Sequence, residues 1–233
     1  MSMTTTKGPI KSARLRLSAR YKYIIMPIDP LILVEKLREV GFSLPARMPR
    51  PPAGTGFTYQ PVGSIGQKGE NSVELDLGKG IIGIEGAKSD EVIKDFQLTE
   101  KILSEEFSVD IENRTWFLVC IAEMTLPGHK SAIETARTQF AESKLFHEIG
   151  QIVGETPIQF GLRLASKSSQ PLDENWLDFK IEPLVNDARS YYVSVVYRNA
   201  NRSKVYNFLT GLEDKVEKVI QTVERSTSTS GSR

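Results

Sequence analysis

The order in which strand-like and helical segments follow one another limits the fold of this chain most strongly. A strand-like segment and a helical segment are followed by three strand-like segments and a second helix, and the whole order then occurs again. Consecutive strands joined by short connections pair as antiparallel hairpins, whereas a doubly wound parallel sheet needs a helix after each strand. We therefore expect an α+β fold with a mainly antiparallel sheet and helices on one face.

The repeated order predicts an internally duplicated unit of strand, helix, three strands and helix. The match lies in the order of elements and not in the amino-acid letters. The expected organisation is a flexible basic arm at 1–13, a first unit at 14–110, a second at 113–225 and a disordered tail at 226–233, and the two units form either two domains or one. As a fold-level analogy, this order is similar to that of TATA-binding-protein-like and helix-grip folds.

Individual elements follow from apolar spacing and capping residues. Asp29 and Pro30 are typical of a helix start, and Gly41 with Phe42 is typical of a helix end. The glycine-rich stretch 63–71 is expected to be a turn region. The expected strands are 14–26, 57–62, 73–77, 81–85, 115–124, 158–164, 177–181 and 191–197, and the expected helices are 30–40, 89–107, one that Ser131 caps, and 203–224.

Positive charge is concentrated at the N-terminus although the chain as a whole has a net charge of only +1. Residues 1–28 contain no acid and six cations, so the other 205 residues sum to −5. On a helix these cations would point in all directions, but on a strand four of them share one face. The candidate contact residues are Lys7, Lys11, Arg14, Arg16, Arg20 and Lys22.

Four interpretations of this basic strand stay open. It can contact an acidic protein surface or a second copy of the chain, or it can follow the phosphates of a nucleic acid. It can also pair with acids on a neighbouring strand, such as Glu74 and Asp76, or protect an exposed sheet edge. A protein partner or self-association is favoured over nucleic acid because the rest of the chain is acidic.

Other sequence patterns give little support for a catalytic or ligand-binding site. The Gly78–Gly83 stretch has the letters of a dinucleotide fingerprint, but Ile81 and Ile82 favour a hairpin over the helix start that the fingerprint needs. Asp178 and Lys180 have nuclease spacing, and their simpler interpretation is the solvated face of a strand. The segment Pro49–Pro52 is either a polyproline ligand or a stiff loop. The sequence predicts no cofactor, no metal site and no identifiable small-molecule ligand.

The single cysteine, Cys120, excludes an intrachain disulfide and is expected to be a buried thiol. The only histidines, His129 and His147, lack ligand spacing for zinc. No signal peptide or membrane span is evident, and a cytoplasmic location is expected.

The sequence favours a non-enzymatic interaction protein or assembly subunit that uses the basic strand as a contact surface. The first alternative is a nucleic-acid-binding protein that uses the same face. The second is an enzyme whose residues converge only in the fold. The candidate pool for that enzyme is Glu74, Asp76, Glu123, Asp178 and His129.

Overall fold

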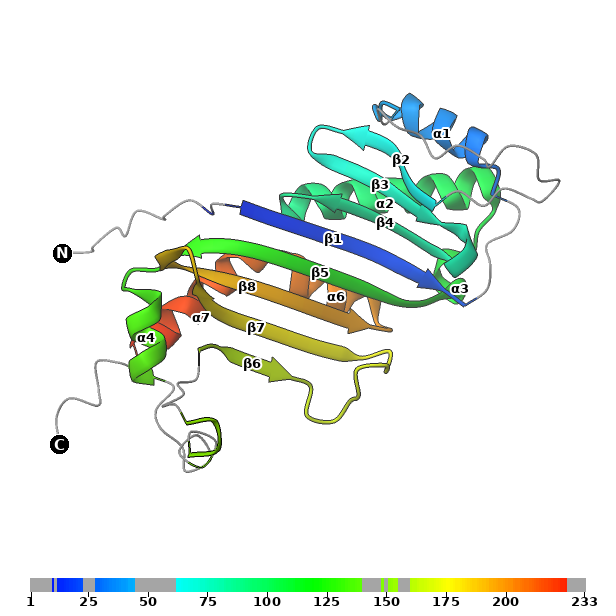
Figure 1. Cartoon of the computed structure of the whole chain (residues 1–233). Coiled ribbons are helices and arrows are strands. Elements are labelled where there is room, and N and C mark those ends of the chain that lie inside the picture. The colour runs from blue at the N-terminus through cyan, green and yellow to red at the C-terminus, as the bar shows by residue number, and fades with distance from the viewer. Residues whose placement is uncertain are drawn as a thin grey trace, which may run out of the picture.

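The computed structural model describes residues 10, 12–22, 28–44, 62–139, 148, 151–154 and 160–225, which form a single eight-stranded sheet with helices (Figure 1). The strands are β1 (Ser12–Tyr21), β2 (Val62–Lys68), β3 (Asn71–Asp76), β4 (Ile81–Gly86), β5 (Thr115–Pro127), β6 (Leu162–Ala165), β7 (Trp176–Leu184) and β8 (Asp187–Asn199). The helices are α1 (Pro30–Glu39), the 3-10 turn η1 (Leu77–Lys79), α2 (Ser89–Phe107), α3 (Ile111–Arg114), α4 (Ala132–Gln139), α6 (Arg202–Leu209) and α7 (Leu212–Arg225).

All neighbouring strands pair antiparallel, in the order β2-β3-β4-β1-β5-β8-β7-β6. This confirms the expected α+β class and antiparallel sheet. From its outer edge to the centre, the first half runs β2-β3-β4-β1 and the second half runs β6-β7-β8-β5. The duplication itself stays a prediction, as do the limits of the two units. The basic arm and the tail 226–233 lie outside the described residues, apart from Ile10, Ser12 and Ala13.

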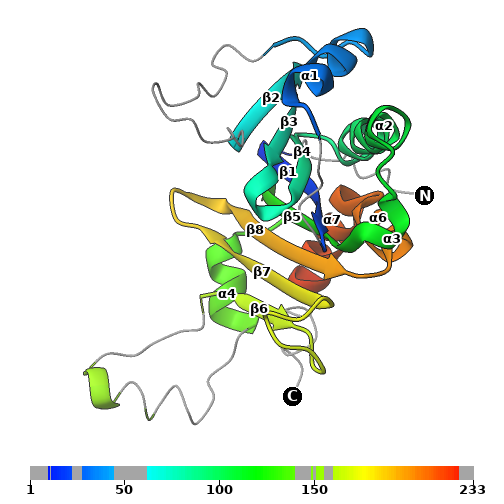
Figure 2. The same cartoon turned by 90° about the vertical axis from the view of Figure 1, so that its right-hand side faces the viewer.

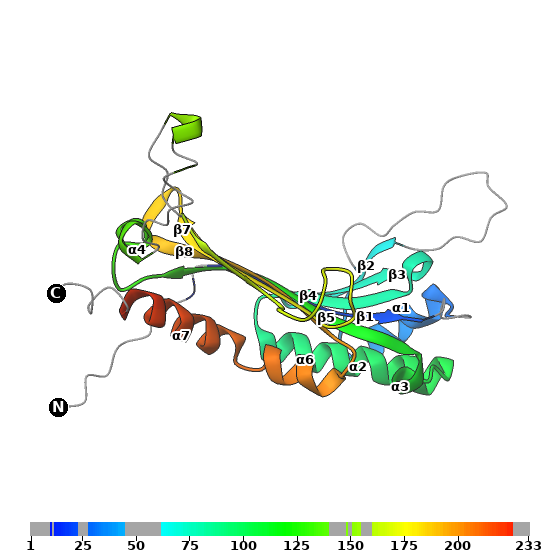
Figure 3. The same cartoon turned by 90° about the horizontal axis from the view of Figure 1, so that it is seen from below.

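The described helices that contact the sheet cover one of its two faces. Seen along the sheet edge, α2, α6 and α7 lie on the same side (Figure 3). On β1, the side chains that point to this side are fully buried: Leu15, Leu17 and Ala19. The buried apolar residues form one cluster that runs from α1 to α7, so both halves share a core.

The first helix begins and ends as the sequence predicts. The Asp29 side chain accepts a hydrogen bond from the N–H of Leu31 at 2.8 Å, and Pro30 occupies the first turn. Gly41 has a φ of 95°, and Phe42 donates its N–H to the carbonyl of Leu37. This end places α1 beside α2 at the β2 edge (Figure 2).

The prediction of a turn region at 63–71 is wrong, because the strand β2 occupies most of these residues. Glycine weakens a strand but is tolerated at a sheet edge, which is where β2 lies. A Cβ on Gly66 would lie 3.4 Å from the Cβ of Phe42 and 3.5 Å from Leu37 Cδ1. Both distances are ordinary van der Waals contacts, so α1 and Phe42 pack closely on the edge strand at Gly66. The strand expected at 57–62 falls outside the described residues except for Val62.

The prediction of a single helix at 203–224 is wrong as well, because the chain forms two helices, α6 and α7, with a break at Thr210 and Gly211. Gly211 has a φ of 62°, which interrupts the helix without strain for glycine. The Lys215 Nζ then donates to the carbonyls of Asn207, Phe208 and Thr210 at 2.6–2.8 Å. The apolar spacing continues across the break because both helices pack on the same sheet face.

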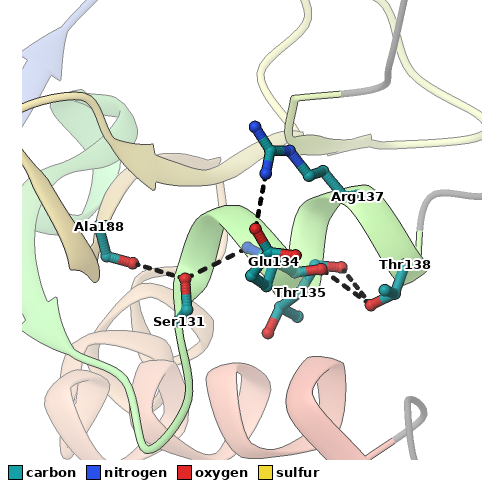
Figure 4. A network of polar contacts seen from close by, with 6 residues as sticks. All are labelled: Ser131, Glu134, Thr135, Arg137, Thr138 and Ala188. Carbon is teal, nitrogen blue, oxygen red and sulfur yellow. Dashed lines mark hydrogen bonds and ion pairs between the residues drawn. The ribbon is translucent and has the colours of Figure 1, made fainter.

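The predicted cap at Ser131 is confirmed (Figure 4). Its hydroxyl accepts a hydrogen bond from the N–H of Glu134 at 3.3 Å and donates to the carbonyl of Ala188 on β8 at 3.4 Å. The cap thus fixes the start of α4 against the sheet. Buried Ala132, Thr135 and Ala136 form the inward side of the helix.

Polar contacts of Ser89 and Glu100, both on α2, join the halves beneath the sheet. Glu213 in the first turn of α7 accepts hydrogen bonds from the N–H of Ser89 at 3.0 Å and from its hydroxyl at 2.8 Å. It therefore caps α2, whose preceding residue makes no side-chain cap. The second contact is the ion pair of Arg202 on α6 with Glu100 on α2, where burial raises the pKa of the Glu100 carboxyl.

The cap provided by Glu213 can be tested by replacing it with alanine. Because the change removes both hydrogen bonds at the start of α2, we expect the free energy of unfolding to fall by about 1 kcal/mol. Urea denaturation followed by circular dichroism measures it. Glu217→Ala is the matched control, since Glu217 is on the same helix and accepts its hydrogen bond from Gln221, one turn along α7, and not from α2. Equal stability of the two variants would contradict the capping role.

Candidate protein-interaction surface

The prediction that the basic N-terminal segment is extended is confirmed between Ser12 and Tyr21. Arg14, Arg16 and Arg20 alternate with the buried side chains of β1 and therefore point to the side opposite the helices. Lys22 follows the strand, and its ammonium lies 3.4 Å from the carbonyl of Asn113. The other two candidate contact residues, Lys7 and Lys11, lie outside the described residues.

Two of the three arginines are paired with carboxylates of the same sheet. Arg14 donates from Nε and Nη2 to the two carboxylate oxygens of Glu85 at 2.7 and 2.9 Å, and this contact raises the pKa of Arg14. Arg16 Nη2 lies 2.8 Å from Glu74, an acid named in the pairing interpretation, although Glu74 is on β3 and not on a strand next to β1. Asp76, the other acid named there, contacts Lys79 at 3.3 Å instead.

The contact between Arg16 and Glu74 depends on a glycine. Arg16 is on β1 and Glu74 is on β3, so the guanidinium must cross β4. Gly83 on β4 is the residue paired with Glu74, and it has no side chain to block this path. A Cβ at Gly83 would also lie 2.8 Å from the Cβ of Ser18 on β1. Because Gly83 has no side chain, the Arg16 side chain can extend across β4 to reach Glu74.

The side of the sheet opposite the helices, which we call the open face, is electrically balanced. On the second half, Arg163 and Asp178 form a two-bond ion pair at 2.6–2.9 Å that lowers the pKa of Asp178, and Lys180 lies 2.7 Å from Glu182. Among the residues that the structure describes, strand alternation and register place six cations and six carboxylates on this face. They are Arg14, Arg16, Arg20, Arg163, Lys180 and Arg198, and Glu74, Asp76, Glu85, Glu123, Asp178 and Glu182.

An apolar strip lies between these two groups of ion pairs. Phe117, Val119 and Ile121 of β5 point to the open face, and Ile121 is in register with Val196 of β8. All four side chains are partly exposed to solvent. Among the described residues, no helix contact covers them, because the helices pack on the other face. The open face thus has an apolar centre and charged margins.

One end of the strip is formed by an aromatic corner, which we define as Trp116, Phe117, Trp176 and Arg198. The register between β1 and β5 shifts at Arg20, which makes Trp116 an extra residue in the strand and leaves it 41% exposed. The Arg198 guanidinium lies 4.9 Å from the Phe117 ring centre. Its Nη1 donates to the carbonyls of Pro171 and Asp173, which positions the β6–β7 connection.

The candidate enzyme residues do not converge. Glu74 and Asp76 are on β3 and Asp178 is on β7, five strand positions away, which corresponds to about 24 Å at the usual spacing. Glu74, Asp76 and Asp178 are each paired with a cation. His129 follows β5, where its N–H donates to buried Glu224. No group of three possible metal ligands occurs within the described ranges.

The nuclease and dinucleotide patterns take their simpler interpretations in the structure. Asp178 and Lys180 point to the open face as paired residues of β7. The Gly78–Gly83 stretch forms η1 and the start of β4, and Gly80 has a φ of 61°. The possible polyproline segment Pro49–Pro52 and His147 lie outside the described residues.

The Cys120 thiol is buried in β5 on the side of the helices. Burial raises its pKa to about 12, with a smaller contribution from Glu213. A thiolate is the reactive form of cysteine, so this side chain is unsuited to act as a nucleophile near neutral pH.

We expect Cys120 to be inert towards a disulfide reagent such as dithionitrobenzoate at pH 8 while the chain is folded. The raised pKa and the closed packing both oppose reaction, whereas the chain unfolded in urea should react fully. The reaction is followed by the absorbance at 412 nm of the thiolate that the reagent releases. Rapid stoichiometric reaction of the folded chain would show that the thiol is accessible after all.

Comparison with known proteins identifies no relative: no family model, no curated protein and no solved structure matches the chain. Within the described part of the chain, no helix has the length and apolar character required to cross a membrane.

Sequence reasoning placed the contact surface on β1 and missed the apolar strip on β5 and β8. A signal was present, because residues 116–122 are apolar at every position. In a sheet with one open face, such a run must place apolar side chains on both sides. The aromatic corner had no comparable signal, since Trp116 and Trp176 are sixty positions apart in the sequence, and only the pairing of β5 with β8 and of β8 with β7 brings them to the same end of the sheet.

Proposed function

We propose that this chain is a non-enzymatic interaction protein that binds a protein partner with the open face of its sheet. The observation that carries the proposal is the apolar strip of Phe117, Val119, Ile121 and Val196 between two margins of ion pairs. An apolar centre with a polar rim is the usual composition of a protein interface. The contact surface is therefore wider than the basic strand alone and is centred on β5 and β8.

Charge favours a protein partner over nucleic acid. Binding to phosphates needs an excess of cations, and each cation neutralised by a nearby carboxylate contributes less to that excess. Arg14 and Arg16 are paired with Glu85 and Glu74, and the described strand residues of this face include six cations and six carboxylates. Among the candidate contact residues that the structure describes, Arg20 and Lys22 are the two that form no ion pair with a carboxylate.

The apolar content distinguishes the open face from an ordinary solvated sheet. One face of an antiparallel sheet commonly meets water, and polar residues then alternate with apolar ones along each strand. On β5 the positions that point to the open face include Phe117, Val119 and Ile121 in succession. The aromatic corner adds tryptophan and arginine, which are enriched among the residues that dominate binding energy.

The proposal predicts that a lysine in the centre of the strip abolishes a native complex. Val196→Lys places an unpaired charge where the partner would exclude water, so the loss of affinity should exceed tenfold. The tagged chain is isolated from extract of its source and sized by gel filtration with light scattering. We expect a species heavier than the 26.0 kDa chain for the natural sequence and a 26.0 kDa species for the variant.

The matched control is Leu31→Lys, which makes the same kind of change on α1, away from the open face, at a side chain 73% exposed. This variant should keep the heavier species, and thermal unfolding of both variants should match that of the natural chain. A natural chain of 26.0 kDa with no co-purifying protein would overturn the proposal. A heavier species made only of this chain would identify the partner as a second copy.

A further inference from the structure

The two edges of the sheet differ in how their backbone groups are covered. At the β2 edge, the N–H of Ser43 donates to the Gln67 carbonyl at 2.7 Å, and the N–H of Gln67 donates back to the Ser43 carbonyl at 2.9 Å. The β2–β3 register also shifts between Ser64 and Gly66, and such irregularities protect edge strands from further pairing. The chain that follows α1 therefore occupies part of this edge as an additional strand would.

The strand at the other edge, β6, turns the backbone of two residues away from the sheet (Figure 1). The N–H of Ser166 donates to the carbonyl of Leu177 at 3.0 Å, so these residues form a hydrogen-bonded pair at the end of the β6–β7 ladder. Hydrogen-bonded and non-hydrogen-bonded pairs alternate along an antiparallel ladder. Arg163 and Ala165 therefore belong to non-hydrogen-bonded pairs, and their N–H and carbonyl groups point away from β7.

The outward backbone groups of β6 are accessible. Among the residues that the structure describes, none bonds to the backbone of Arg163 or Ala165 on this side, and both residues are exposed. A charged side chain can guard an edge strand, but the Arg163 guanidinium is held by two bonds to Asp178 on β7. It is therefore turned back over the sheet and leaves the edge uncovered.

Exposed apolar surface lies next to these backbone groups. Leu164 is in register with buried Phe179, so its side chain points to the side of the helices. The helix α4 packs on β7 and β8, and Leu164 is left 49% exposed. A strand added beside β6 would place a side chain of its own next to Leu164 and remove it from water.

The spacing of the outward groups selects an extended polypeptide as the occupant. Arg163 and Ala165 are two positions apart, which corresponds to about 6.6–7 Å along a strand. An extended chain repeats its outward N–H and carbonyl groups at the same interval, so two of its residues can pair with both. A helix bonds its backbone groups internally and offers no such row. The same kind of contact is made by Ser43 at the opposite edge.

A second copy of β6 fits this edge poorly because cations would meet. In a two-fold antiparallel pairing centred on Arg163, the two Arg163 side chains would lie directly opposite one another. Centring the pairing on Leu164 would place them diagonally, and centring it on Ala165 would place Arg163 opposite Lys167 of the other copy. Like charges in these positions are unfavourable, which favours a different protein as the source of the strand.

We propose that β6 receives an extended segment of a protein partner as an added strand, bonded to the outward backbone of Arg163 and Ala165 and covering Leu164 with an apolar side chain. The inference goes beyond the proposed function, because this surface is the edge of the sheet and not its open face. Since β6 is 4 residues long, the partner needs only a short accessible segment with alternating apolar side chains.

The test is a titration of the folded full chain with the peptide acetyl-Thr-Val-Thr-Val-Thr-amide, which is neutral and rich in β-branched residues. Nitrogen-15 NMR and amide hydrogen exchange follow the contact. We expect millimolar peptide to shift the amides of Arg163 and Ala165 and to slow their exchange, because their N–H groups gain an acceptor. The Gln67 amide, which already donates to Ser43, should not change. The same peptide with every backbone nitrogen methylated should not bind.

Ala165→Pro removes one outward N–H and leaves the bonds between β6 and β7 in place. Because the proline ring also fills the position of the acceptor, affinity for the peptide should fall by more than about tenfold. Ala165→Val keeps the N–H and is the matched control, and thermal unfolding of both variants checks that the fold is retained.

Three results would overturn the inference. They are unchanged Arg163 and Ala165 amides in the natural chain, equal binding of the methylated peptide, and equal affinity of the two Ala165 variants. Slow exchange at Arg163 and Ala165 that depends on chain concentration without peptide would also overturn it, by assigning the edge to a second copy.

The two proposals fail in different ways. If the peptide leaves β6 unaffected while Val196→Lys abolishes the native complex, the edge site is wrong and the open face stands. If the peptide pairs with β6 but the natural chain is isolated alone at 26.0 kDa, the proposed function is wrong and the edge site stands.

Discussion

The antiparallel pairing of β1 with β5 is the constraint on which the rest of the structure depends. It joins the two halves at the centre of the sheet, from Ser12 opposite Thr125 to Arg20 opposite Phe117. Because side chains alternate along both strands, this register decides at once which residues meet the helices and which meet the open face. A shift by one position would move Arg14 and Arg16 into the core and expose Leu15 and Leu17.

The same pairing produces the mixed character of the open face. It places the charged side of β1 next to Ile121 and Val119 of β5, so that an ion-paired margin borders an apolar strip. On the other side of the strip, β5 pairs with β8 and β8 pairs with β7, so a second margin of ion pairs borders the apolar centre there. The helices act on this surface indirectly: α2, α6 and α7 bury the other face, and the contacts of Glu213 and Arg202 hold the two halves together beneath it.

Local signals in the sequence predicted local features well. Asp29, Pro30 and Gly41 predicted the limits of α1, and alternation at 14–21 predicted the direction of the arginines. Two elements were missed because long-range packing overrides a local preference: Gly66 forms an edge strand beneath Phe42, and Gly211 breaks a helix whose apolar spacing continues. The pairing of Arg16 with Glu74 was one of several open interpretations. Choosing it required knowledge that β4 lies between them with Gly83 at the crossing.

The central claim is that the open face contacts another protein, and hydroxyl-radical footprinting of the chain in native extract tests it most directly. We expect the side chains of Phe117, Trp176 and Tyr192 to be oxidised more slowly in the native species than in the isolated chain. Exposed side chains on the helical side, such as Leu31, should be oxidised equally in both. Equal oxidation of the open face in both samples, or slower oxidation confined to the helical side, would contradict it.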